Sequence, residues 1–523
     1  MKCVETLAAR PPIDLGKPTR RARLGTEALI KGFFGSNALV AIIVLALITI
    51  FLFREGFGFF EQNLKNIRLY RRAGLEYVDI IRVPAERHVA LSRQLHDIRL
   101  QEARAHTAGV GLEQFDHFAT AFSNAGEELN GLVSEATDVA IALRDHLLGR
   151  AAETPADDFP LDNPPSEQAG GVALPVDPVQ GMVALRTLGP KFEKIADSMR
   201  ARIDNLLGSP PQIASSEASQ AFEKWKAKTR HNLAQLPASA EQLREWDAHK
   251  PVPAYRAVTS FLFGRDWITA SFWQDWYGII PLLVGSIMVA VVALVLAVPL
   301  GVSSAIYVSE IAARGEKSLI KPYIEFISAI PSVVLGFFGI AVVGEAVRAL
   351  SQASFMKWVP FFPISERLNV FTAGCLLALM AVPTIFTLAE DALQNVPRGF
   401  KEASYALGAN RLQTILRVLV PASLSGIISA VLLGLGRVIG ETMVVLLCAG
   451  NRIAIPDFTE GLGAFFQPVH TMTGIVAQEM GEVDYGSIHY RALFMVGLVL
   501  FGLTLGINYL AQKIVGRYRM SIG

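Results

Sequence analysis

Apolar residues along the chain gather into six blocks that are separated by polar segments. The first block runs from Ala38 to Phe53, and the other five fall in the second half of the chain, at 279–308, 323–347, 370–388, 424–449 and 492–514. A membrane hydrocarbon core of about 30 Å takes roughly 20 helical residues to cross, and the blocks are close to this length or longer. The pattern predicts an all-α polytopic membrane protein with six transmembrane helices.

The segment between the first two blocks, residues 55–275, has a different pattern. Charged residues occur every few positions, and no stretch is apolar enough to span a membrane. Apolar residues recur at intervals of three and four, which is typical of helices that bury one stripe, in 88–104, 112–150, 181–207 and 217–246. The stretch 153–178 is rich in Pro, Asp and Gly and is expected to be an exposed linker. We therefore expect an inserted helical domain or a pair of helical hairpins here.

Basic residues set the predicted topology. Residues 1–36 are polar and basic, and the loops after the second, fourth and sixth blocks are also basic. The positive-inside rule then places both termini in the cytoplasm and the 55–275 domain on the external, periplasmic side. A cleaved signal peptide is the alternative for the first block. The basic lead is long and no small-residue cleavage site follows the block, so we expect an uncleaved first helix at 37–54.

Composition excludes several function classes. The chain has 523 residues, of which 51% are hydrophobic and 18% charged, with a formal net charge of +1. No basic stripe with interleaved aromatics indicates a nucleic-acid partner. The three cysteines lie far apart, without a disulfide framework or metal-ligand spacing. No G-x-x-x-x-G-K-[ST] run is present, so the chain is not expected to be an ATPase or to hold a cofactor of its own.

The segment 396–421 passes from a charged, amphipathic stretch to a Val-Pro that precedes an apolar block. Residues 397–407 can form one short helix and 410–418 a second, with Gly408 supplying a positive-φ turn between them. Pro421 suits the first turn of the next membrane helix, where its missing N–H costs little. Two short helices at an angle on the cytoplasmic face would form a knob that fits a groove on a partner.

The spacing in this segment resembles a known motif. Glu402-Ala403-Ser404, three residues, Gly408, nine residues and then Val418-Leu419-Val420-Pro421 resemble the EAA loop, EAA-x3-G-x9-I-x-L-P, of permease subunits of binding-protein-dependent ABC importers. Ser404, Val418 and Val420 replace the usual Ala, Ile and Leu. The resemblance implies that this loop docks into a separate ATP-binding subunit, with Glu402, Ala403, Gly408 and Pro421 as coupling residues. An amphipathic surface helix without a partner is the alternative.

Other stretches resemble the phosphate permeases of this family, and among them the PstC-type subunits more than the PstA-type ones. These stretches are 278–286, 299–301, 329–336, 382–384, 390–393 and 436–443. The resemblance covers about 261–523 and the first helix, and the domain at 55–255 departs from it. It implies a type I ABC importer permease domain at 276–523 with five transmembrane helices, in a bacterial inner membrane.

The resemblance also implies partners. A PstA-type permease would form the second half of the pathway, a homodimeric ATPase would bind ATP and Mg, and a periplasmic phosphate-binding protein would deliver the substrate. Membrane lipid would surround the spans. The alternatives left open are a permease for sulfate, molybdate or phosphonate, and a membrane sensor whose external domain signals inward. A sensor predicts a cytoplasmic signalling domain, which neither short terminus offers.

Arg437 and Glu441 are the candidate pathway charges. They lie four residues apart in an apolar block, where a helix would bring them close enough to pair. Arg437 would attract an anion, and Glu441 would neutralise it at rest; a purely structural pair is the alternative. Ser332, Thr384 and Thr442 are candidate hydroxyl donors to phosphate, or else bond their own backbone carbonyls. Pro299, Pro331 and Pro383 indicate either kinks or helices broken beside a pathway.

Overall fold

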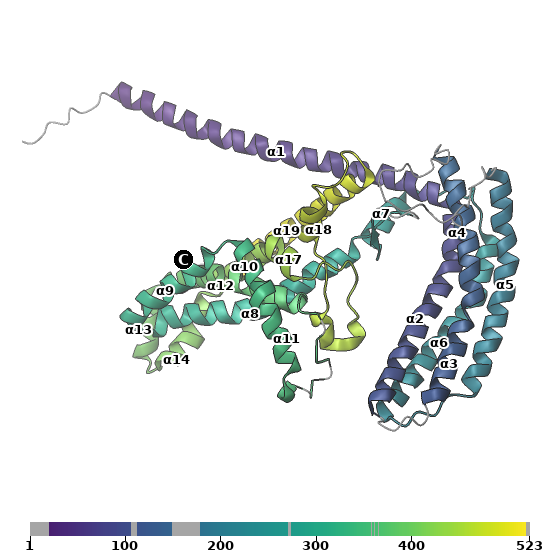
Figure 1. Cartoon of the computed structure of the whole chain (residues 1–523). Helices are drawn as coiled ribbons and strands as arrows, with labels where there is room; N and C mark the ends of the chain where they lie inside the picture. Colours follow the sequence, from purple (N-terminus) through teal and green to yellow (C-terminus); the bar gives the residue numbers. More distant parts are fainter. Residues whose placement is uncertain are drawn as a thin grey trace, which may run out of the picture.

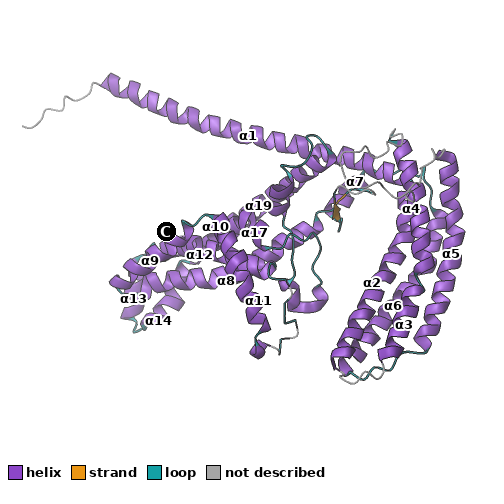
Figure 2. Ribbon diagram, viewed as in Figure 1, coloured by secondary structure: helices purple, strands orange, loops and turns teal. Residues whose placement is uncertain are grey.

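The computed structural model describes residues 20–105, 112–148, 178–269 and 274–518, except Lys357, Pro360 and Ser365. Residues 1–19 of the predicted N-terminal tail and 153–177 of the predicted linker lie outside this part. The described chain is almost entirely helical, with one short β-hairpin (Figure 2). It divides into a bundle of long helices and a larger group of membrane-type helices, which the first helix connects (Figure 1).

The first helix, α1, spans Arg20–Arg72 and has 53 residues. It therefore extends beyond the predicted 37–54 at both ends. Its apolar half, up to Phe53, is exposed in the single chain. Its second half buries Phe59, Asn63, Ile67 and Tyr70 at intervals of four, four and three. This helical spacing explains why the helix continues past the membrane block. Gly74, at φ +76°, makes the turn that follows α1.

The bundle is built from five helices with one shared apolar core: α2 (Leu75–Ala105), α3 (Leu112–Asn124), α4 (Glu127–Leu147), α5 (Pro178–Gly208) and α6 (Ser216–Glu245). Each segment with the predicted amphipathic spacing contains helix. The predicted segment 112–150 forms two helices instead of one. Gly126 begins the second, and a Cβ there would lie 2.2 Å from the ring of His88, so the corner requires glycine.

A short connector joins the bundle to the membrane-type helices. It consists of α7 (Tyr255–Leu262), β1 (Trp267–Ile268) and β2 (Trp276–Tyr277), with the two strands antiparallel. Phe261, Trp267 and Tyr277 share a core with Phe59 of α1. This core is separate from that of the bundle, so α1 is anchored to the membrane-type helices by its own contacts.

The remaining helices follow in order. They are α8 (Ile280–Ile306), α9 (Arg314–Ser328), α10 (Ser332–Phe338), α11 (Gly344–Gln352), α12 (Val370–Gln394), α13 (Arg398–Ala406), α14 (Arg411–Thr414), α15 (Val420–Ala422), α16 (Leu424–Gly440), α17 (Met443–Cys448), α18 (Met472–Glu479) and α19 (Ile488–Tyr518). A π-helical turn at Tyr307–Ile311 continues α8. A second, at Gly339–Val343, joins α10 to α11. A third, at Ile415–Leu419, joins α14 to α15. Two 3-10 turns, Ser354–Met356 and Phe458–Phe466, lie in loops.

Five described helical segments are long and apolar enough to cross a membrane, and a pair bent by 68°, Arg411–Ala422 with Leu424–Gly440, makes a sixth if it is one span. The predicted bounds are wrong for the third span. The third span is Ser332–Gln352 instead of 323–347. Pro331 lacks the N–H that would continue α9 and restricts the residue before it, so α9 ends at Ser328. Pro299 and Pro383, in contrast, lie inside α8 and α12.

The central pair of this group is α8 and α12, which pack along each other and share a core with α16 and α17. Helices α9, α13 and α14 lie at one end of this pair, and the bundle lies beyond the other end (Figure 1). The loop at 396–421 and the inserted domain are therefore at opposite ends of the membrane-type helices.

Candidate functional site

The turn between α13 and α14 forms as the sequence predicts. Gly408 has φ +83° and donates its N–H to the carbonyl of Tyr405 at 2.9 Å, and Ala409 donates to the carbonyl of Ser404 at 3.2 Å. Asn410 then caps α14: its side chain accepts from the N–H of Gln413, whose own side chain accepts from the N–H of Asn410. These bonds hold the two short helices at a fixed angle.

Ser404, the residue that departs from the usual EAA pattern, has a structural role. Its side chain is buried, and its hydroxyl lies 2.9 Å from the hydroxyl of Thr414 across the turn. An alanine here would leave Thr414 with only its bond to the carbonyl of Asn410. The serine therefore links α13 to α14 inside the loop. The sequence offered no signal for this pairing, because the partner lies ten residues away on another helix.

The loop is anchored to the end of α8 by charge. Lys401 forms an ion pair with the buried carboxylate of Glu310, and the guanidinium of Arg411 donates to the carbonyls of Glu310 and Ile311. A second pair lies nearby, where the ammonium of Lys321 on α9 approaches the buried Glu390 of α12 at 3.0 Å. The hydrogen bond to Glu390 raises the pKa of Lys321 above its usual value. The sequence alone carried no signal for these contacts, because the residues that meet lie in distant segments of the chain.

The outer face of the loop is exposed and partly apolar. Glu402 and Ala403 are both exposed. Around them lie exposed large side chains, with Leu407 at 89%, Leu412 at 60% and Leu416 at 57% of their full accessibility. Phe400 and Tyr405 are exposed as well. An apolar group around one carboxylate, at the tip of a loop with a rigid base, is typical of a surface that a partner covers.

Pro421 lies in α15, a three-residue turn before the bend, and not in the first turn of α16 as predicted. The chain then bends at Ser423, whose hydroxyl bonds back to the carbonyl of Leu419 at 2.8 Å, and α16 begins at Leu424. The base of the loop packs through Ile415 and Leu419 into a core with Phe386 of α12 and Val308 of α8. Movement of the loop is therefore connected to both central helices.

Arg437 and Glu441 do not form the predicted pair. Helix α16 ends at Gly440, and Glu441 has an extended backbone with ψ 134°, so the two side chains no longer share a helical face. The guanidinium of Arg437 instead donates to the hydroxyl of Thr384 on α12 at 3.2 Å. The structure thus brings two of the predicted pathway residues together and removes Glu441 from that contact.

The other candidate hydroxyls lie near breaks in the helices. Ser332 is the first residue of α10, directly after Pro331, and Thr442 is the residue before α17. Helices α10 and α17 pack against each other. Beside them, a Cβ added to Gly436 or Gly440 would meet nothing within 4 Å. The end of α16 that carries Arg437 therefore faces open space in the single chain, where an exposed charge on an apolar helix needs water or another subunit.

This combination defines a class: a multi-pass helical membrane protein with an exposed loop of two short helices and a charged helix end that faces away from its own core. A family model described as "Binding-protein-dependent transport system inner membrane component" matches residues 297–514. The chain is 36% identical to the probable ABC transporter permease protein YqgH of Bacillus subtilis over 242 residues, which is 45% of this chain and 72% of that protein. The chain belongs to this family of transport permeases.

Further relatives carry the name of one transport system. The phosphate transport system permease protein PstC of Haemophilus influenzae is 30% identical over 277 residues, covering 50% of this chain and 84% of the relative. PstC of Pasteurella multocida is 29% identical over 272 residues, covering 50% and 82%. Among solved structures, the inward-facing MetNI methionine ABC transporter matches with 20% identity and a TM-score of 0.34, covering 46% of this chain and 95% of that chain. The family match begins at residue 297, so the bundle lies outside it.

Proposed function

We propose that this chain is the permease subunit of an ATP-driven phosphate importer. It would form one half of a heterodimeric pathway with a PstA-type permease, receive phosphate from a periplasmic binding protein, and couple to a homodimeric ATPase that holds ATP and Mg. Both termini would be cytoplasmic. The observation that carries the phosphate assignment is Arg437, an exposed cation on an apolar helix that hydrogen-bonds to Thr384 and pairs with no acidic side chain among the described residues.

An unpaired arginine on this helix suits an anion because its charge is available to the substrate. The planar guanidinium presents several donors to an oxyanion, and hydroxyl groups add further donors. Thr384 holds the guanidinium in place without neutralising it. The names of the PstC relatives support phosphate as the anion.

Coupling is proposed to pass through the loop of α13 and α14. Glu402 and the apolar side chains around it would be covered by the ATPase. When the ATPase closes, the loop would move as a unit, since Gly408 and the Ser404–Thr414 contact fix its shape. Lys401 and Arg411 would transmit the movement to the end of α8 and switch the pathway between outward and inward access.

The test is uptake of labelled phosphate by cells or proteoliposomes that contain the complete transporter, with an excess of unlabelled oxyanion added. Excess unlabelled phosphate is expected to abolish uptake of the labelled phosphate. Excess sulfate, molybdate or phosphonate is expected to leave that uptake unchanged. No uptake of labelled phosphate, together with uptake of labelled sulfate, molybdate or phosphonate by the same transporter, would instead assign the permease to that anion. The family membership would stand in either case.

A further inference from the structure

A pocket beside the bundle lies where the end of α1 meets the segment between α6 and α7. Its volume is about 270 Å³, and eight residues line it. Four of them carry a permanent positive charge, namely Arg68, Arg71, Arg72 and Lys250, and none is acidic. His249 completes the polar lining. The pocket lies outside the residues matched by the family model, and the proposed transport function does not use it.

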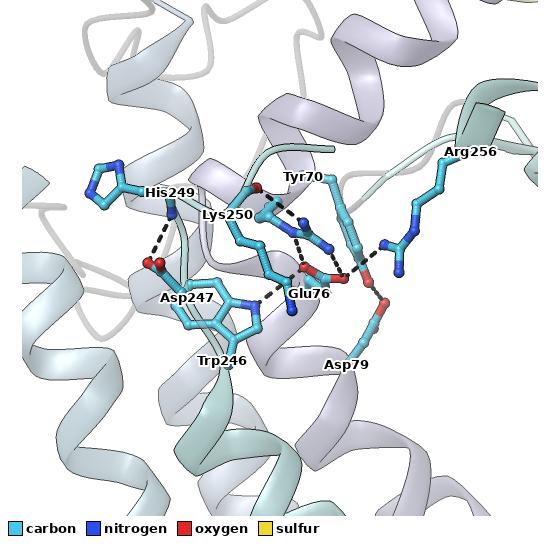
Figure 3. A network of polar contacts seen from close by, with 9 residues as sticks. Tyr70, Glu76, Asp79, Trp246, Asp247, His249, Lys250 and Arg256 are labelled. Carbon is cyan, nitrogen blue, oxygen red and sulfur yellow. Dashed lines mark hydrogen bonds and ion pairs between the residues drawn. The ribbon is translucent and has the colours of Figure 1, made fainter. Parts of the chain in front are cut away.

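One of the four cations is structural. Arg71 is buried and forms a two-point ion pair with Glu76, with Nε to Oε2 at 2.6 Å and Nη2 to Oε1 at 2.8 Å. Its third nitrogen donates to the carbonyl of Lys250 at 3.1 Å, and the indole of Trp246 donates to Glu76 at 3.3 Å (Figure 3). This network fixes the segment 246–250 against the corner of α1 and α2. The charge of Arg71 is compensated by Glu76.

The other three cations are not compensated in this way. Arg68, Arg72 and Lys250 are exposed and have no acidic partner among the described residues. The nearby carboxylate of Asp247 accepts the backbone N–H of His249 at 3.0 Å (Figure 3). The helix dipole places only about half a negative charge at the C-terminus of α1. Several other basic side chains of the bundle are paired, as in Lys191–Glu135, Arg202–Glu128 and Arg244–Glu193. Arg68, Arg72 and Lys250 thus place three uncompensated positive charges around one cavity.

The position along α1 indicates where the ligand comes from. Phosphate groups occur both in solution and in lipid headgroups. Arg68 lies 15 residues beyond Phe53, where the apolar block ends, and at 1.5 Å per residue this is roughly 22 Å along the helix. The headgroup region adds only about 5 to 8 Å to each side of the hydrocarbon core. Because α1 is one continuous helix through this region, the pocket lies in water beyond the headgroups.

We propose that Arg68, Arg72 and Lys250 form a binding site for a free phosphate-type oxyanion beside the bundle, separate from the transport pathway. Arg71 and Glu76 position the segment that carries Lys250, and the three free cations supply charge-assisted hydrogen bonds to the tetrahedral anion. The site would let the inserted domain bind an anion of the same class as the proposed substrate without transporting it. The proposal needs only the bundle geometry and stands independently of the proposed function.

The test is calorimetric titration of the purified full-length chain with inorganic phosphate at about 0.15 M salt, where exposed charges are well screened. The titration uses the Arg437→Gln background, so that the pathway cannot contribute. Saturable binding is expected. The double variant Arg68→Gln/Arg72→Gln, made in that background, should bind about tenfold more weakly or worse, and Lys250→Gln should weaken binding in the same direction. Both changes are at exposed side chains, and thermal unfolding checks that each variant is folded.

The matched control is Lys224→Gln, which removes an exposed cation from α6 outside the pocket. Phosphate binding is expected to remain unchanged in it. Equal weakening by Lys224→Gln would reveal a general charge effect and overturn the site. Absence of saturable phosphate binding would overturn it as well. A parallel arm measures co-sedimentation with phosphatidylglycerol vesicles, and binding to vesicles without binding of free phosphate would overturn the assignment to a soluble anion. Loss of transport in the uptake assay would bear on the proposed function alone.

Discussion

Arg437 illustrates what one side chain contributes when its environment is apolar. The guanidinium sits near the end of α16 and donates to Thr384 of α12, while the neighbouring glycines at 436 and 440 leave open space beside it. A charge on such a helix is costly unless water, a partner or an anion meets it. Because Glu441 lies past the end of the helix, the resting charge of Arg437 is not neutralised by it.

Arg437→Gln is therefore expected to abolish phosphate uptake while the complex still assembles. Glutamine keeps most of the size of the side chain and a donor for Thr384, and it removes only the charge. Uptake of labelled phosphate and co-purification of the partner subunits measure the two effects separately. Arg437→Lys serves as the control, because it keeps the charge and should retain part of the uptake. Normal uptake by the glutamine variant would exclude Arg437 from the pathway.

Glu402 is the exposed carboxylate at the centre of the apolar surface of the loop. Glu402→Arg is expected to weaken binding of the ATPase. If the ATPase covers Glu402, a positive charge at this position would face a surface that is complementary to a negative one. The measure is the amount of ATPase that co-purifies with the permease. The matched control is Glu113→Arg on α3, an exposed glutamate of the bundle outside the loop. Undiminished co-purification with Glu402→Arg would mean that the ATPase docks elsewhere.

At the scale of elements, the loop of α13 and α14 depends on one backbone conformation. Gly408 has φ +83°, and a Cβ added there would meet no neighbouring atom within 4 Å, so strain in the left-handed region is the main cost of any side chain. Gly399, inside α13, also has open space around it but lies in a helix. The two glycines therefore separate backbone strain from side-chain crowding.

Gly408→Ala is expected to destabilise the turn by about 1 kcal/mol, which corresponds to roughly fivefold more frequent local opening. The amide of Ala409, which bonds to the carbonyl of Ser404, reports this as faster hydrogen exchange. Gly399→Ala should leave that exchange unchanged or slower, since alanine favours a helix. Equal exchange rates in the wild type and the Gly408 variant would show that the turn does not need the positive φ.

Much of the position of the helices and turns could be predicted from the sequence. Apolar block length located the membrane-type helices, threefold and fourfold spacing located the bundle helices, and glycine and proline chemistry located the turn of the coupling loop. The residues at which helices end inside apolar blocks were harder to predict. The end of α16 at Gly440 falls inside an uninterrupted apolar block, so hydropathy carries no signal for it. The Glu310–Lys401 pair joins distant segments, and a single sequence contains no information on which charges meet.

At the scale of the whole molecule, the bundle and the membrane-type helices have separate cores. Phe192 packs in the core of the bundle, which also takes Tyr70 from the end of α1, whereas Phe59 of α1 packs with Phe261, Tyr277 and residues of α19. Helix α1 belongs to both parts. Its contacts with α7 and α19 do not depend on the bundle. The bundle therefore resembles an insertion whose removal leaves the permease core complete.

Replacing residues 74–248 by a short Gly-Ser linker tests this directly. The two ends lie close together, since Arg71 contacts the carbonyl of Lys250 at 3.1 Å. The shortened chain is expected to assemble with its partners and to transport phosphate at a rate of the same order as the full chain.

Two point variants provide matched controls for the deletion. Phe59→Ala removes a ring from the core of α1 and α19 and should destabilise the permease by about 3 to 5 kcal/mol, which reduces the yield of assembled complex. Phe192→Ala costs a similar amount in the bundle core, yet uptake per assembled complex should stay near normal, because that core is not shared with the membrane-type helices. Phe59→Ala is expected to impair assembly in any case. If the deletion and Phe192→Ala abolish assembly as well, then the bundle is required to hold the permease subunits together. Its separate core would in that case belong to a docking domain and not to an accessory one.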